Sequence, residues 1–143
     1  DNAWMDEGLA EFVTYLYLDE TGITPLHNQI AGNVKTYTTY VDVLNRYYAQ
    51  VDTTFRPSYC YKNDSEYVIF TYVKGSLLFN TLYETMGKTK FWKALSNYYD
   101  NACYTVATPS KLIDCFAKTG GNELATIFDA YVNGKEIIGK ITD

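Results

Sequence analysis

Two short segments contain residues whose types and spacing are suited to chemistry. The first segment, residues 4–12 (W-M-D-E-G-L-A-E-F), places the adjacent carboxylates of Asp6 and Glu7 at the start of a predicted helix. Taken alone, this pair is typical of an ordinary acidic helix start, because negative side chains interact favourably with the positive end of the helix dipole. The residue types therefore favour a structural role unless a second feature accompanies them.

The second segment, residues 72–78 (Y-V-K-G-S-L-L), lies inside another predicted helix. Glycine within a helix costs about 1 kcal/mol relative to alanine, so Gly75 indicates either a close approach of two backbones or a functional geometry. Tyr72 alone would be interpreted as a core-facing residue of an amphipathic helix. Lys74 is either a surface cation paired with an acid or a residue with a role at a site.

Together, the two segments resemble motifs of the aminopeptidase N and leukotriene hydrolase family of zinc metallopeptidases, the gluzincins. The first is similar to the family's W-L-N-E-G-F-A-x-Y, and the second to its Y-x-K-G. Glu7 and Tyr72 lie 65 positions apart, in the order and at the interval of the family, which is more specific than either motif alone. The resemblance covers about residues 1–134. Asp6 departs from it, because the family usually has asparagine there.

The resemblance implies a role for each of the two residues. Glu7 would be the third protein ligand of a catalytic zinc, which takes three protein ligands and leaves a fourth position for water. Tyr72 would donate a hydrogen bond to the oxyanion that forms when a peptide bond is hydrolysed. The negative charge of Asp6 beside the site would alter the hydrogen bonds that support the zinc ligands.

The chain lacks the H-E-x-x-H motif that supplies two histidine ligands and the general base in this family. Its single histidine, His27, has no Glu or His partner at metal-binding spacing and is expected on the surface. The resemblance therefore implies that the motif precedes Asp1 in a longer zinc aminopeptidase acting on peptides. The 143 residues alone are expected to bind no zinc tightly and to be inactive.

The elements that must position these residues are predicted to be helices. Apolar residues recur at helical spacing in each expected segment. Thr108 and Pro109 form a typical helix start, and Gly87 lies where a helix should end. The expected buried stripes include Tyr48 in the second helix, Ile69, Tyr72, Ser76, Phe79 and Tyr83 in the third, and Phe91, Trp92, Leu95 and Tyr99 in the fourth. The expected helices span about residues 4–18, 26–50, 65–86, 89–101, 108–120 and 123–132.

This pattern predicts an all-α fold of about six helices. By the resemblance, residues 1–134 form the helical lobe of a thermolysin-like zincin catalytic domain that lacks the H-E-x-x-H helix. Residues 135–143 form a tail, either strand or coil, that leads to a following domain or to the terminus.

The composition limits the classes of partner. Hydrophobic residues make up 47% of the chain, enough for a real core, and the net charge of −5 with scattered lysines argues against nucleic-acid binding. No apolar run is long enough to span a membrane. Cys60, Cys103 and Cys115 match no C-x-x-C metal motif, and three buried free thiols are favoured over one disulfide plus one thiol.

Three other functions remain open at this stage. The chain could derive from a peptidase that has lost catalysis and now binds peptides or proteins, or it could be a helical interaction domain unrelated to enzymes. It could also belong to an endopeptidase or another gluzincin hydrolase. An intact H-E-x-x-H upstream would support the peptidase, and the placement of Glu7 and Tyr72 in the fold tests the resemblance itself.

Overall fold

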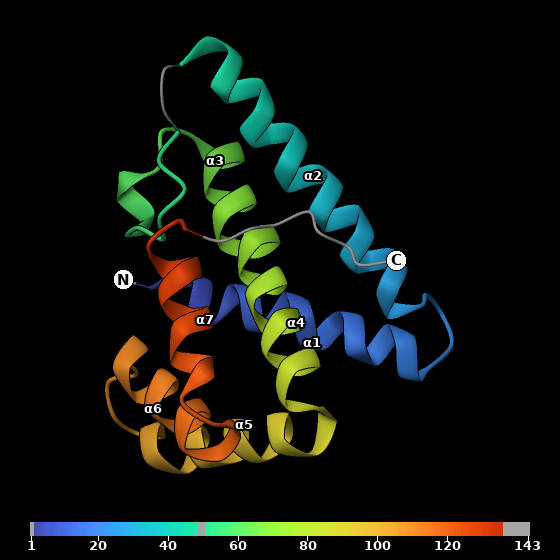
Figure 1. Cartoon of the computed structure of the whole chain (residues 1–143), viewed down its shortest axis with the longest axis vertical. Coiled ribbons are helices and arrows are strands. Elements are labelled where there is room, and N and C mark those ends of the chain that lie inside the picture. The colour runs from blue at the N-terminus through green and yellow to red at the C-terminus, as the bar shows by residue number, and fades with distance from the viewer. Residues whose placement is uncertain (1, 49–50, 136–143) are drawn as a thin grey trace.

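The structure is a computed structural model of the chain, and it describes residues 2–48 and 51–135. Within these residues the chain forms helices and loops and no strand, so the all-α prediction is confirmed (Figure 1). The α-helices are α1 (Glu7–Glu20), α2 (Leu26–Tyr47), α3 (Asp64–Val68), α4 (Lys74–Met86), α5 (Lys88–Ala102), α6 (Pro109–Gly120) and α7 (Glu123–Val132). Two 3-10 turns, η1 (Ala3–Met5) and η2 (Ser58–Cys60), and a π-helical turn, η3 (Ile69–Val73), complete the list.

A long central helix organises the fold. It consists of α3, η3 and α4, which follow one another without a break, so the predicted helix over 65–86 is confirmed and all six predicted helices are present. The single buried stripe predicted for this helix is wrong, because every residue from 74 to 80 is buried. The physical reason is that α1, α2, α5 and α7 all contact α4, which leaves it little exposed surface. Figure 1 shows α1 crossing this central helix.

Aromatic rings fix the start of α1 in the core. Trp4, which is 2% exposed, stacks on Phe55 with ring centroids 4.8 Å apart and ring planes 8° apart. Two turns further along, Phe12 packs edge-on against Phe91 at 5.6 Å. Burying such large side chains contributes roughly 1.5–3 kcal/mol each. These contacts therefore hold Glu7, which lies between them in the sequence, in a fixed place.

Local signals at the helix ends are confirmed. The Thr108 side chain accepts a hydrogen bond from the backbone N–H of Lys111, and Pro109 is the first residue of α6. Gly87 ends α4 with a φ of +78°, a backbone conformation that favours glycine. The second helix begins at Leu26 as predicted and ends at Tyr47. Its predicted end at Gln50 lies outside the described residues, as does most of the predicted tail, residues 136–143.

Buried faces are predicted less well than helix ends. In α5, Phe91 is fully buried, but Trp92 and Tyr99 are 40% and 66% exposed, so their predicted place in the buried stripe is wrong. Tyr48, after α2, is 54% exposed and is also wrongly placed in a buried stripe. α5 contacts α4 and α6, and α2 contacts α1, η3 and α4, so each helix buries only the face turned toward those partners.

The cysteines also differ in part from expectation. All three are free, as predicted, but only Cys115 is buried. Cys60 is exposed, and Cys103 is half-buried. The prediction of three buried thiols is therefore correct for the free state and wrong for the burial of Cys60 and Cys103.

Lys74 is a buried residue and not a surface cation. Its ammonium group donates hydrogen bonds to the backbone carbonyls of Thr53 and Tyr131, and it lies 4.5 Å from the centroid of the Phe55 ring. The carbonyls belong to the loop before η2 and to the last turn of α7. Lys74 thus joins two segments that lie far apart in the sequence, and the interpretation as a residue of the surface is wrong.

Replacing Lys74 with methionine should lower the free energy of unfolding by about 3 kcal/mol, because the half-buried Thr53 carbonyl and the buried Tyr131 carbonyl would lose a donor. Urea unfolding followed by circular dichroism measures this change. Lys90→Met on the exposed face of α5 is the control and should change the free energy little. A similarly small effect of Lys74→Met would contradict the role of Lys74 as a structural link.

Candidate functional site

The side chains of Glu7 and Tyr72 meet where α1 begins. Glu7 is the first residue of α1, and Tyr72 lies in the π-helical turn η3. A hydrogen bond with the Glu7 carboxylate is the main cause that raises the pKa of Tyr72 to about 12, and partial burial adds to it. A neutral phenol can donate to a carboxylate, which can only accept, so the two groups are suited to each other as donor and acceptor. The fold therefore brings together the two residues that the sequence motifs singled out.

Tyr67 belongs to the same site, although the sequence did not indicate it. Its ring packs edge-on against Tyr72, with centroids 6.1 Å apart and planes 77° apart. Burial raises the pKa of Tyr67, and the nearby charges of Glu7 and Asp6 raise it further. The neutral phenol of Tyr67 thus lies beside the same carboxylates as Tyr72.

The π-helical turn explains why Tyr67 was missed. On a regular α-helix with 3.6 residues per turn, residues five apart point in different directions. In a π-helical turn the hydrogen bonds link residues five apart, so Tyr67 and Tyr72 come to the same side. The signal in the sequence was the spacing of five residues between the two tyrosines. The α-helical period does not place residues five apart on one face, so it does not reveal this pair. π-Helical turns occur frequently at functional sites.

The loop before α3 supports Tyr67 from behind. Tyr61 packs edge-on against Tyr67 at 5.7 Å, and the Arg56 guanidinium lies 4.8 Å from the Tyr61 centroid. Arg56 also pairs with the Glu66 carboxylate at 3.4 Å, and Glu66 is only 3% exposed. A buried ion pair is costly to break, because the remaining charge would lack a partner. The Arg56–Glu66 pair therefore helps to hold the rings of Tyr61 and Tyr67 in place.

Asp6, the departure from the family pattern, lies beside a separate hollow. A cavity of ≈ 400 Å³ is lined by Asp6, by neighbouring residues of η1 and α1, and by Tyr98 of α5. Burial raises the pKa of Tyr98, and the charges of Cys115 and Asp6 contribute further. Asp6 thus adds negative charge near both the Glu7–Tyr72 pair and this hollow.

A metal site of the expected kind would take only the Glu7 carboxylate from the described residues. Among residues 2–48 and 51–135, no group of three or more His, Cys, Asp or Glu side chains is arranged to hold a metal ion. His27 is exposed on α2, as predicted. A carboxylate oxygen is a normal zinc ligand, and Glu7 is half-exposed on a fixed helix start, which fits such a donor.

The comparison with known families identifies the chain. Residues 1–131 match the family model described as the Peptidase family M1 domain. The chain belongs to peptidase family M1. No curated protein and no solved structure matches it.

Membership of family M1 supports a peptidase as the parent of these residues, and it excludes a helical domain unrelated to enzymes. The all-helical structure is consistent with the helical lobe of an M1 peptidase. In the part of this M1 chain that the structure describes, every helix is too short or too polar to cross a bilayer.

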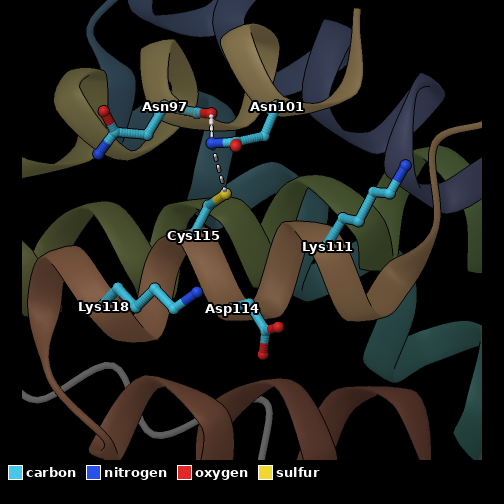
Figure 2. Close-up of a pocket in the computed structure, with 6 residues that line it drawn as sticks. All are labelled: Asn97, Asn101, Lys111, Asp114, Cys115 and Lys118. Atoms are coloured by element: carbon cyan, nitrogen blue, oxygen red, sulfur yellow. Dashed lines mark hydrogen bonds between the residues drawn. The ribbon is translucent and has the colours of Figure 1, made fainter. Parts of the chain in front are cut away.

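The M1 chain has a second hollow between α5 and α6, of ≈ 290 Å³, which contains no residue of the Glu7–Tyr72 site. Figure 2 shows Asn101 between Asn97 and Cys115, and its amide donates to the Asn97 carbonyl at 2.6 Å. The ammonium group of Lys111 donates to Thr105 and Val106 at 2.9 Å. Asn101 and Lys111 thus have hydrogen-bond partners within the chain, and we interpret the hollow as a surface feature.

Proposed function

We propose that these residues are part of a zinc-dependent aminopeptidase that hydrolyses peptide bonds near the N-terminus of peptides. Glu7 supplies one zinc ligand, and Tyr72 stabilises the oxyanion. The observation that supports this proposal best is the close approach of the Tyr72 phenol to the Glu7 carboxylate, which raises the pKa of Tyr72 although the two residues lie 65 positions apart in the sequence. A metal ligand and an oxyanion donor must lie next to each other to act on one carbonyl group.

Glu7 is suited to hold a metal because it cannot move freely. It starts α1, and the buried rings of Trp4 and Phe12 fix the backbone on both sides of it. Its half-exposed carboxylate remains accessible to a ligand group from outside the described residues. Zinc bound by Glu7 and two histidines would polarise the substrate carbonyl and lower the pKa of a bound water.

Tyr72 is suited to donate a hydrogen bond during the reaction. Its raised pKa of about 12 keeps the phenol protonated at neutral pH. When the Glu7 carboxylate is engaged as a zinc ligand, the phenol hydrogen of Tyr72 is available to a substrate oxygen. Packing against Tyr67 limits rotation of the Tyr72 ring, so the donor is oriented before the charge develops.

The experiment that tests this proposal uses the complete protein. Purified protein should contain zinc, release the chromophore from aminoacyl anilides, and lose activity on chelation and regain it with added zinc. Residues 1–143 alone should show neither zinc nor hydrolysis. N-acetylated substrates are the matched control for specificity, because an aminopeptidase requires a free amino group.

Each other outcome has a definite meaning. Zinc-free, inactive complete protein that still binds peptides would replace the aminopeptidase by a non-catalytic binding module. Zinc-containing protein that cleaves N-acetylated peptides internally would keep the peptidase and reject the aminopeptidase specificity.

A further inference from the structure

Two buried glycines allow α1 and the central helix to touch through their backbones. A Cβ atom on Gly8 would lie 2.7 Å from the Cα and 2.8 Å from the carbonyl carbon of Gly75. A Cβ atom on Gly75 would lie 2.8 Å from the Cα of Gly8. Because the opposing atoms are backbone atoms, no side-chain rotation relieves these contacts. A side chain at either position must therefore push the two helices apart.

The glycine contact adjoins the candidate site. Glu7 directly precedes Gly8, and Tyr72 lies three residues before Gly75. The contact extends into η3, because the Thr71 carbonyl oxygen lies 3.1 Å from the Cβ position of Gly8. A separation of the helices at the glycines is therefore transmitted to the distance between the Glu7 carboxylate and the Tyr72 phenol.

A hydrogen-bonded network holds the end of the π-helical turn. The Ser76 hydroxyl donates to the carbonyl of Val73, the last residue of η3, at 2.8 Å. The Asn33 side chain from α2 donates to the Ser76 hydroxyl at 2.8 Å and to the Tyr15 hydroxyl of α1 at 2.9 Å. Residues of α1, α2 and α4 thus support the turn that contains Tyr72.

We propose that the Gly8–Gly75 contact and the Ser76-supported π-helical turn position Tyr72 against Glu7, and that these residues are positioning residues for catalysis. The inference rests on the proposed function of Tyr72. The inference explains why α4 contains a glycine despite its cost in a helix, because only a residue without a Cβ atom allows α1 to come this close.

The test is a double-mutant cycle in the complete, zinc-loaded enzyme. Gly75→Ala should lower kcat about 100-fold with little change in KM, because displacement of a catalytic group by about 1 Å has an effect of that order. In the Tyr72→Phe background the same substitution should change kcat little, since the group that it displaces is already absent. A loss of the same size in both backgrounds would show general structural damage and would overturn the inference.

Controls keep the cycle decisive. Gly32→Ala on α2 is the matched control, because a Cβ atom there meets nothing within 4 Å, and its activity should stay unchanged. If Gly75→Ala does not fold, Ser76→Ala takes its place in the cycle. Ser76→Ala should lower kcat by a smaller factor, and only when Tyr72 is present. An unchanged kcat in Tyr72→Phe overturns the proposed function and the inference together. If Tyr72→Phe lowers kcat, and the substitution of Gly75 or Ser76 lowers it by the same further factor in the Tyr72→Phe background, only the inference is overturned.

Discussion

Replacing Tyr72 with phenylalanine in the complete enzyme is expected to lower kcat about 100- to 1,000-fold and to leave KM nearly unchanged. The substitution removes one hydroxyl group and keeps the ring, so the packing of Tyr72 against Tyr67 is retained. A donor that acts on the developing oxyanion stabilises the transition state more than the bound substrate, so its loss appears in kcat. Steady-state hydrolysis of an aminoacyl anilide measures both constants.

Two neighbouring tyrosines provide controls for this experiment. Tyr83, on α4, packs edge-on against Phe12 and Phe91 away from Glu7, and Tyr83→Phe should leave kcat unchanged. Tyr67→Phe removes the other hydroxyl beside Glu7 and tests whether Tyr72 alone is the donor. If Tyr67→Phe gave the larger loss and Tyr72→Phe none, the oxyanion role would have to be moved to Tyr67.

Replacing Glu7 with glutamine is expected to abolish most zinc binding and, with it, hydrolysis. The loss of zinc affinity should exceed about 100-fold, because removal of groups that only support a metal ligand already costs about 10- to 100-fold. Glutamine has nearly the same shape, so the start of α1 should remain folded. Zinc content by atomic emission and affinity by competition with a chelator are the measurements.

Asp6→Asn is the matched control for Glu7→Gln. It removes the same charge from the adjacent residue, and Asp6 lines the separate hollow near Tyr98. Zinc content should therefore be retained in Asp6→Asn. If both variants lost zinc equally, a general effect of negative charge would explain the result, and Glu7 would lose its assignment as a specific ligand.

The two motifs were visible in the sequence because they are local and specific in type. The family match over residues 1–131 shows the coarser part of what they indicated, membership of peptidase family M1, and the structure places Glu7 close to Tyr72. The roles of these residues as ligand and donor stay predictions that the two substitutions test. Of the two explanations that the sequence left open for Gly75, the close approach of two backbones is present in the structure, with Gly8 as the opposing residue.

The place of Tyr67 beside Tyr72 and the burial of Lys74 could not be predicted from the sequence. The spacing between Tyr67 and Tyr72 only places them together if the helix contains a π-helical turn, and the α-helical period gives no sign of it. Lysine is almost never fully buried without partners, and the sequence left open only a surface cation paired with an acid or a role at a site for Lys74. Its partners include the carbonyls of Thr53 and Tyr131, which lie far away in the sequence.

The sequence by itself determined the helices, their ends and the acidic start of α1, because capping residues, glycines and apolar periodicity act within one or two turns of the chain. Tertiary structure alone decided which helix faces are buried, the π-helical turn before α4, and the approach of Gly8 to Gly75. These features depend on which segments pack against each other across long intervals of sequence. Glu7 becomes part of the candidate site only because the crossing of two helices places Tyr72 beside it.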